Sequence, residues 1–149
     1  GYNCSQSVVA AFAPQLGLPE EMALRLSAGF GAGIGRMREV CGAFCGVVTV
    51  LNMVYADPAD PKDKSRMYAL VQQAAEQYRA RNGGGSIICR ELLAKAGAAP
   101  TGGTAAEERT ADYYKKRPCP ELCRISADLC AEFIAAHPEG RHGFYREDT

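Results

Sequence analysis

The feature that most constrains the fold of this chain is an uncharged stretch in its first half. Across positions 40–56, 17 consecutive residues carry no charge and include no proline. Strands usually end within about 4–8 residues, so a run of this length favours a helix. A membrane span needs about 20 apolar residues, and this stretch contains Thr49, Asn52 and two glycines. We therefore expect a buried central helix and no membrane span.

Helical patterns on both sides of this stretch predict an all-α fold. Apolar residues recur at helical spacing across 5–16, and 62–82 has the pattern of a long amphipathic helix. Further helices are expected at 19–28, at 87–96 with Ser86 as its cap, at 105–116 and at 120–136. At 149 residues the chain fits one domain, 1–149. The prediction is a single-domain bundle of five or six helices.

Charge and cysteine content narrow the range of partners and compartments. Seventeen basic and seventeen acidic residues cancel, so no overall field attracts nucleic acid or an anionic membrane. Seven cysteines form an odd set that is too sparse for a small disulfide scaffold, and no secretory leader is evident. We expect a cytoplasmic protein with free or metal-bound thiols. Because the chain opens at Gly1 rather than Met, the sequence leaves open what precedes it.

Four of the cysteines fall at the starts of four different expected helices. A helix N-terminus has unpaired N–H groups and a partial positive charge, which favour the thiolate and lower the cysteine pKa. Thiolate is the form that binds metal or attacks a disulfide. If the connections bring these helix ends together, the thiols form one site. These residues are Cys4, Cys41, Cys89 and Cys119.

The other three cysteines are weaker candidates for site residues. Cys45 lies one turn after Cys41, and Cys123 lies one turn after Cys119, so both are candidate auxiliary ligands or resolving thiols. Cys130 lies deeper in the last expected helix and is interpreted as a core residue. The alternative for all seven is that they are small buried residues that only fill the core.

Glycines at alternate positions across 29–35 precede the central helix. Nucleotide-binding glycine loops follow a strand and have the spacing GxGxxG or GxxxxGK[ST], and neither condition is met here. We expect these glycines to provide close backbone packing or positive φ angles instead. Arg36 and Arg38 follow them and either lower the pKa of Cys41 or only solvate the loop.

Two short segments around these cysteines are distinctive: residues 1–6, Gly-Tyr-Asn-Cys-Ser-Gln, and residues 41–46, Cys-Gly-Ala-Phe-Cys-Gly. They resemble elements of the C_GCAxxG_C_C family of redox-active proteins. Residues 41–46 are similar to its CGAxxG motif, and residues 1–6 look like its GxNCxQ element. Residues 86–93 look like its third cysteine element, and Cys119 to Cys123 is similar to its CxxLV pattern. The resemblance covers about residues 1–134. Cys45, Cys123 and Cys130 are departures from the family pattern.

The resemblance implies a function in redox chemistry or electron transfer. Similar domains occur in split-Soret cytochromes c, joined to haem-binding segments. This chain has no CxxCH sequence, and its only histidines are His137 and His142, so covalent c-type haem is excluded. The chain is expected to act as an oxidoreductase or electron carrier whose redox partner is unknown, and analogy allows a homodimer.

Three chemistries fit the predicted cysteine site. The first is a [2Fe–2S] or [4Fe–4S] cluster on Cys4, Cys41, Cys89 and Cys119, with Gly42, Ala43 and Gly46 allowing backbone N–H groups to approach the sulfurs or serving helix packing. The second is thiol–disulfide exchange by Cys41 with Cys4 or Cys89. The third is structural zinc, favoured by the spacing of Cys41 with Cys45 and of Cys119 with Cys123. A helical interaction module without a redox site is the remaining reading.

Overall fold

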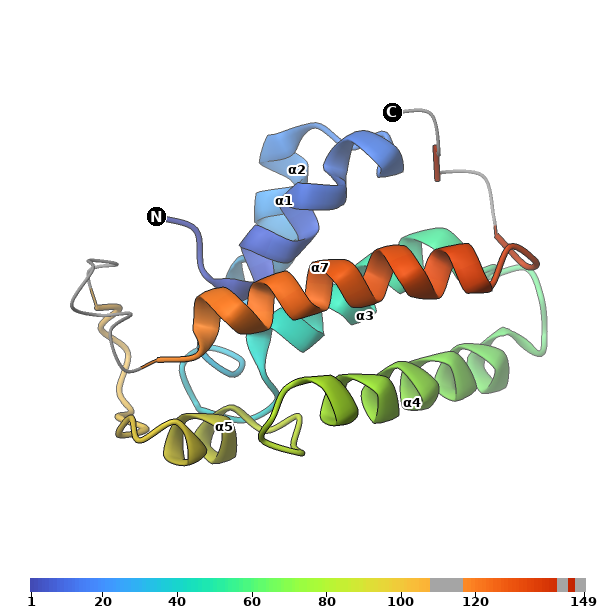
Figure 1. Ribbon diagram of the computed structural model, residues 1–149. Helices are drawn as coiled ribbons and strands as arrows, with labels where there is room; N and C mark the ends of the chain where they lie inside the picture. The colour runs from blue at the N-terminus through green and yellow to red at the C-terminus, as the bar shows by residue number, and fades with distance from the viewer. Residues whose placement is uncertain (108–116, 142–144, 147–149) are drawn as a thin grey trace.

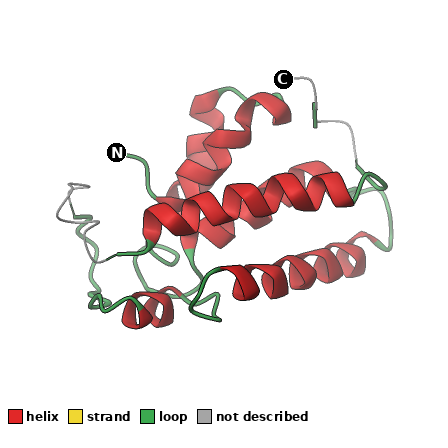
Figure 2. Ribbon diagram, viewed as in Figure 1, coloured by secondary structure: helices red, strands yellow, loops and turns green. Residues whose placement is uncertain are grey.

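The expected all-α fold is confirmed. The structure is a computed structural model and describes residues 1–107, 117–141 and 145–146. Within these residues there are helices and loops but no strand, apart from one isolated antiparallel bridge between Val40 and Ile88 (Figure 2). No helix in the described part is long and apolar enough to cross a membrane.

The observed α-helices begin and end within two residues of the expected positions, and a short 3-10 helix that was not expected follows the second of them. In chain order they are α1 (Cys4–Leu16), α2 (Glu20–Ser27), the short 3-10 helix η1 (Ala28–Phe30), α3 (Gly42–Tyr55), α4 (Asp63–Arg81), α5 (Cys89–Lys95) and α7 (Cys119–Ala136). The helix expected at 105–116 lies mostly outside the described residues, since 108–116 are not described. Residues 105–107 are not helical.

Ser86 does not cap α5 in the way the sequence suggested. The N-cap residue is Ile88, and no side chain caps the helix. The Ser86 hydroxyl instead accepts a hydrogen bond from the Ile88 N–H at 3.0 Å and donates one to Glu91 at 2.9 Å. Ile88 is held in extended conformation because it pairs with Val40, and this pairing delays the start of the helix to Cys89.

Local signals define both ends of α1, and the one at its start explains why the helix begins at Cys4. Asn3 and Gln6 form a capping box, in which each side chain accepts a hydrogen bond from the backbone N–H of the other residue. At the far end Gly17 adopts a left-handed conformation with φ of 67°, which ends the helix at little steric cost. The cap therefore fixes the first residue of the helix, which is a predicted site cysteine.

Helix α3 is the centre of the fold, as expected from its lack of charge. Ten of its fourteen residues are buried, and α1, α4 and α7 all pack against it. Figure 1 shows α3 and α7 running in the same direction and α4 returning in the opposite direction. One cluster of buried apolar residues joins these helices, with Val47, Leu51 and Leu129 fully buried in it.

This arrangement gathers several helix starts at one end of the molecule. Helix α4 returns the chain to the end at which α3 begins, so the short helix α5 lies there too (Figure 1). Helix α7 also starts at this end, and the N-terminal segment leads into α1 beside it (Figure 1). The direction of the long helices thus brings the predicted site residues to one place.

Candidate functional site

Four cysteines from four helices line one small cavity at this end of the fold. Cys41 is buried, and the other three, Cys4, Cys89 and Cys119, are half-buried. Each is the first residue or the N-cap of its helix, as the sequence predicted. The rest of the wall is contributed by apolar residues, glycines and one arginine, namely Ala32, Gly33, Arg38, Gly42, Leu92, Leu93, Pro118 and Leu122. The convergence of the four helix starts is therefore a feature of the fold.

Backbone pairing holds Cys41 and Cys89 next to each other. The Cys41 N–H donates to Ile87 O at 2.7 Å, and the Cys89 N–H donates to Glu39 O at 2.6 Å. These bonds flank the antiparallel bridge between Val40 and Ile88. Two segments almost fifty residues apart are thus fixed at the positions where their cysteines enter helices.

The glycine loop packs directly beneath this pairing. A Cβ on Gly33 would lie 2.6 Å from the Cβ of Cys89 and 2.7 Å from the Arg38 Cα, and its φ is +75°. Ala32, Ile34 and Arg36 also have positive φ, an uncommon conformation that costs about 1 kcal/mol or more per residue. The expectation that this loop serves close packing and left-handed turns is confirmed.

The second half of the same loop and the residues after it do not offer free N–H groups to a phosphate. Every backbone N–H at positions 34–39 donates to a carbonyl within residues 29–34. An anion site at a glycine loop requires N–H groups that point at the ligand. Those of this stretch are already used by the loop itself.

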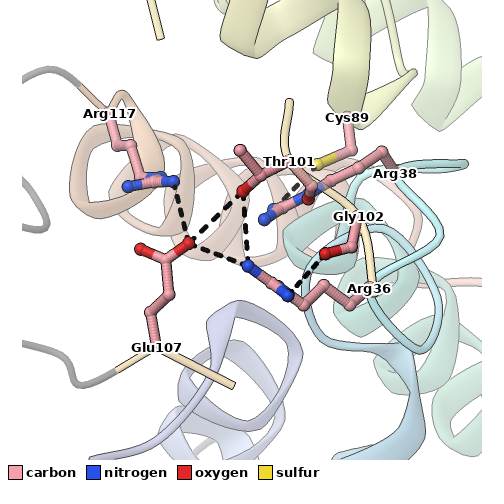
Figure 3. Close-up of polar contacts among 7 residues, drawn as sticks. All are labelled: Arg36, Arg38, Cys89, Thr101, Gly102, Glu107 and Arg117. Atoms are coloured by element: carbon pink, nitrogen blue, oxygen red, sulfur yellow. Dashed lines mark hydrogen bonds and ion pairs between the residues drawn. The ribbon is translucent and has the colours of Figure 1, made fainter. Parts of the chain in front are cut away.

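Arg38 brings a buried positive charge to the cavity wall. Its side chain is among the few buried polar groups of the protein, with a residue exposure of 5 %. Its Nε donates to Thr101 O at 2.9 Å, and its Nη1 lies 3.9 Å from the Cys89 Sγ (Figure 3). Among the described residues no carboxylate forms an ion pair with it. Its charge therefore acts on Cys89, rather than on Cys41 as the sequence suggested.

Arg36 lies further out and holds the loop that covers this side. It donates to Gly102 O at 2.7 Å and pairs with Glu107 at 2.8 Å, and Arg117 approaches the same carboxylate at 3.6 Å (Figure 3). Arg36 is thus occupied by residues 101–107 and does not contact a cysteine. Of the two arginines singled out in the sequence, only Arg38 belongs to the cavity.

The cysteine pKa values run opposite to the sequence expectation. Burial raises the pKa of Cys41, while the Tyr78 hydroxyl and the backbone N–H groups of Phe44 and Ala43 only partly oppose it. Burial likewise raises the pKa of Cys89, against the lowering effect of Arg38. The helix starts do favour the thiolate, but the desolvation of a buried charge is the larger effect.

Cys4 is coupled to two thiols at once. A hydrogen bond with Cys119 lowers its pKa, but a hydrogen bond with Cys123, burial and the charge of Cys41 raise it, and the pKa of Cys4 lies well above its usual value. Because Cys89 raises the pKa of Cys41 and Cys119 raises the pKa of Cys89, the four thiols form a closed ring of interacting neighbours. Four thiols that share one cavity would resist joint ionisation without a positive charge among them.

The three additional cysteines occupy different surroundings. Cys123 does not line the cavity, but its thiol approaches Cys4 O at 3.7 Å. Cys45 is buried one turn into α3 with its sulfur 3.8 Å from Val40 O, and burial raises its pKa to about 11. Cys130 is fully buried in the core, as expected. Cys123 therefore contacts one of the four cavity cysteines, and Cys45 interacts with Cys41 through charge.

Some of the small residues of the CGAxxG segment line the cavity, and others allow the helices to pack closely. Gly42 lines the cavity, and a Cβ there would lie 2.8 Å from Phe30 O. Gly46 does not line it; a Cβ on Gly46 would lie 2.8 Å from the Val8 Cβ, so this glycine lets α1 approach α3. Ala43 is fully buried, and its N–H faces the Cys41 sulfur.

Tyr78 is the site residue that sequence reasoning missed. Its hydroxyl lies 3.3 Å from the Cys41 Sγ, and the residue is fully buried. The apolar spacing of the 62–82 helix indicates that Tyr78 faces inward. The spacing does not indicate which residue the Tyr78 hydroxyl contacts. That contact depends on the packing of α4 against α3.

The four thiols form the donor set of the site. Among the described residues, no group of three or more His, Cys, Asp or Glu side chains is placed to hold a metal ion. The cavity measures about 20 Å³, room for about one water molecule. A larger group would therefore need the thiols to turn outward about their Cα–Cβ bonds. The four sulfurs, the apolar wall and the Arg38 cation fit a negatively charged group with sulfur ligands.

The fold and the cavity define a helical protein with a cysteine-lined site. The family model described as "Putative redox-active protein (C_GCAxxG_C_C)" matches residues 2–133, and the chain belongs to this family. Comparison with curated proteins and with solved structures gave no match.

Proposed function

We propose that this redox-active protein carries electrons on an iron–sulfur cluster bound by Cys4, Cys41, Cys89 and Cys119. The observation that carries the proposal is the meeting of these four thiols, each from the start of a different helix, around one cavity. Four cysteine thiolates are the usual ligands of [2Fe–2S] and [4Fe–4S] clusters. When bound, such a cluster accepts and releases electrons without any change in the ligands.

Arg38 supports the same proposal through its charge. A buried charge is costly unless an opposite charge lies near it. Arg38 has no carboxylate partner among the described residues and points at a cysteine. A cluster with four thiolates carries net negative charge, and the guanidinium offsets part of that charge. The arginine thus has a role in the loaded protein that it lacks in the metal-free one.

Thiol–disulfide exchange is less well supported by the site. Exchange requires a free thiolate as the attacking group, and the pKa values of Cys4 and Cys41 are both raised. A ligand thiol does not face this obstacle, because the metal itself displaces the proton. Structural zinc would use the same four thiols, so metal analysis of the reconstituted protein decides between zinc and a cluster.

Anaerobic reconstitution tests the proposal, and Arg38→Met sharpens it. Metal-free protein is incubated with ferrous iron and sulfide, then desalted. We expect broad visible absorbance in the wild type and clearly less bound iron in R38M. We also expect metal-free R38M to be more stable than the wild type by about 1 kcal/mol or more in urea, because a buried unpaired charge has been removed. Arg38→Lys, which keeps the charge, is the matched control.

The outcomes separate the alternatives. Uptake of zinc but not of iron with sulfide would replace the cluster by a zinc site. A protein that binds neither, but exchanges disulfides through Cys41, would support the dithiol reading. Full iron uptake in R38M would mean that the Arg38 charge is not needed for cluster binding, and it would not argue against the four cysteine ligands.

A further inference from the structure

Tyr78 is held rigidly against one of the proposed ligands. The residue is fully buried on α4, and its ring lies against Phe44 with a centroid separation of 5.3 Å. Its hydroxyl lies 3.3 Å from the Cys41 Sγ, which is hydrogen-bond distance to a sulfur. A phenol fixed in this way cannot turn to solvent for another partner.

The direction of this hydrogen bond depends on the state of Cys41. In the metal-free protein either the thiol or the phenol can donate. Once the sulfur is a metal ligand it has lost its hydrogen, so only the phenol donates. A tyrosine hydroxyl has an ordinary pKa of about 10, so the phenol keeps its proton at neutral pH. Loading of the site therefore converts an ambiguous contact into an O–H···S hydrogen bond.

A second hydroxyl stands behind the tyrosine. The Ser126 Oγ on α7 is buried, and its interaction with the Tyr78 hydroxyl lowers the pKa of Tyr78. When Tyr78 donates to the sulfur, its oxygen can accept from Ser126. Two hydrogen bonds that share one hydroxyl polarise each other, so donation from Ser126 strengthens the hydrogen bond from Tyr78 to the sulfur.

We propose that Tyr78 raises the reduction potential of the group bound through Cys41 by donating its phenolic hydrogen to the Cys41 sulfur, with Ser126 as second donor to the phenol. The inference rests on the proposed function, since it requires a redox-active group on that sulfur. Reduction adds one electron and makes the sulfur more negative, while the proton stays on Tyr78. Hydrogen bonds to ligand sulfurs stabilise the reduced form and are one of the determinants of cluster potentials.

The test compares Tyr78→Phe with wild type in a redox titration of the visible spectrum. Phenylalanine keeps the ring and its packing on Phe44 and removes only the hydroxyl. We expect a lower potential, by an amount that corresponds to about a tenfold change in the reduction equilibrium, or about 59 mV for a one-electron couple. Iron content is expected to stay at the wild-type value.

Tyr55→Phe is the matched control. Tyr55 is also buried, but its hydroxyl donates to His137 O at 2.8 Å, away from the cavity. Its removal is expected to leave the potential unchanged. Ser126→Ala serves as the second variant, with an expected shift in the same direction as Y78F but smaller. If Y78F fails to hold iron, the reduction potential of Ser126→Ala tests the inference in its place.

The possible failures can be told apart. An unchanged potential in Y78F with its iron retained overturns the inference and leaves the proposed function intact. If Y78F loses its iron, an unchanged potential in Ser126→Ala likewise overturns the inference. A wild-type protein that binds no iron overturns both. A shift of equal size in Tyr55→Phe would mean that general loosening of the core, and not the hydrogen bond to Cys41, sets the potential.

Discussion

Serine in place of Cys4, Cys41, Cys89 or Cys119, one at a time, is expected to abolish the visible absorbance of the protein. The four thiols line one cavity, so each supplies one of the proposed ligands. Loss of a residue that merely supports a ligand costs roughly 10–100-fold in metal affinity, and loss of a ligand should cost at least as much. The measurement is iron bound per chain, with the visible spectrum, in anaerobically purified variants.

The remaining cysteines supply the controls for this series. Cys130→Ala removes a thiol from the core without touching the cavity, so it is expected to keep iron despite some loss of stability. Cys123→Ala removes the thiol that approaches Cys4 O and is expected to weaken binding without abolishing it. If only two of the four serine variants lose function, and that function is disulfide exchange, the dithiol reading is correct.

Alanine at Gly46 is expected to damage both the fold and the site. The added Cβ would lie 2.8 Å from the Val8 Cβ and 3.2 Å from Ser5 O, with backbone atoms of α1 unable to move aside alone. Overpacking of this kind typically costs about 1–3 kcal/mol. Because Ser5 follows Cys4 directly, displacement of α1 moves Cys4 away from the other thiols. We expect a lower unfolding free energy in urea together with a loss of bound iron.

Two variants check the physical cause of the Gly46 effect. Gly29→Ala places a methyl group where nothing lies within 4 Å, and it is expected to change stability by no more than about 0.5 kcal/mol. Val8→Gly combined with Gly46→Ala removes the Val8 Cβ and Cγ1 atoms that the new methyl group would meet. The double variant should recover part of the bound iron. No recovery, with normal folding, would mean that Gly46 acts on the site in another way.

The helices were predictable because their signals are local. The uncharged run sets the position of α3, and Gly17 ends α1 through a left-handed conformation that glycine adopts easily. The placement of cysteines at helix starts follows from the same signals. In contrast, the start of α5 depends on the pairing of Val40 with Ile88, two segments far apart in sequence, and the expected Ser86 cap was wrong for that reason.

The chemistry of the site was less predictable than its position. Helix starts suggested lowered cysteine pKa values, but the pKa depends mainly on burial, which periodicity cannot measure at a helix end. The partner of Arg38 and the contact of Tyr78 with Cys41 both arise from tertiary packing. Gly46 lies within the motif segment, yet its surroundings show a packing role rather than a cavity role.

Metal analysis of the native protein is the decisive experiment on whether the four cysteines hold an iron–sulfur cluster. The protein is purified without oxygen, and iron, acid-labile sulfide and zinc are measured per chain beside the visible spectrum. We expect iron and sulfide in equal amounts, with broad visible absorbance. A colourless protein without iron and sulfide, which also fails to take them up on reconstitution, would rule the cluster out.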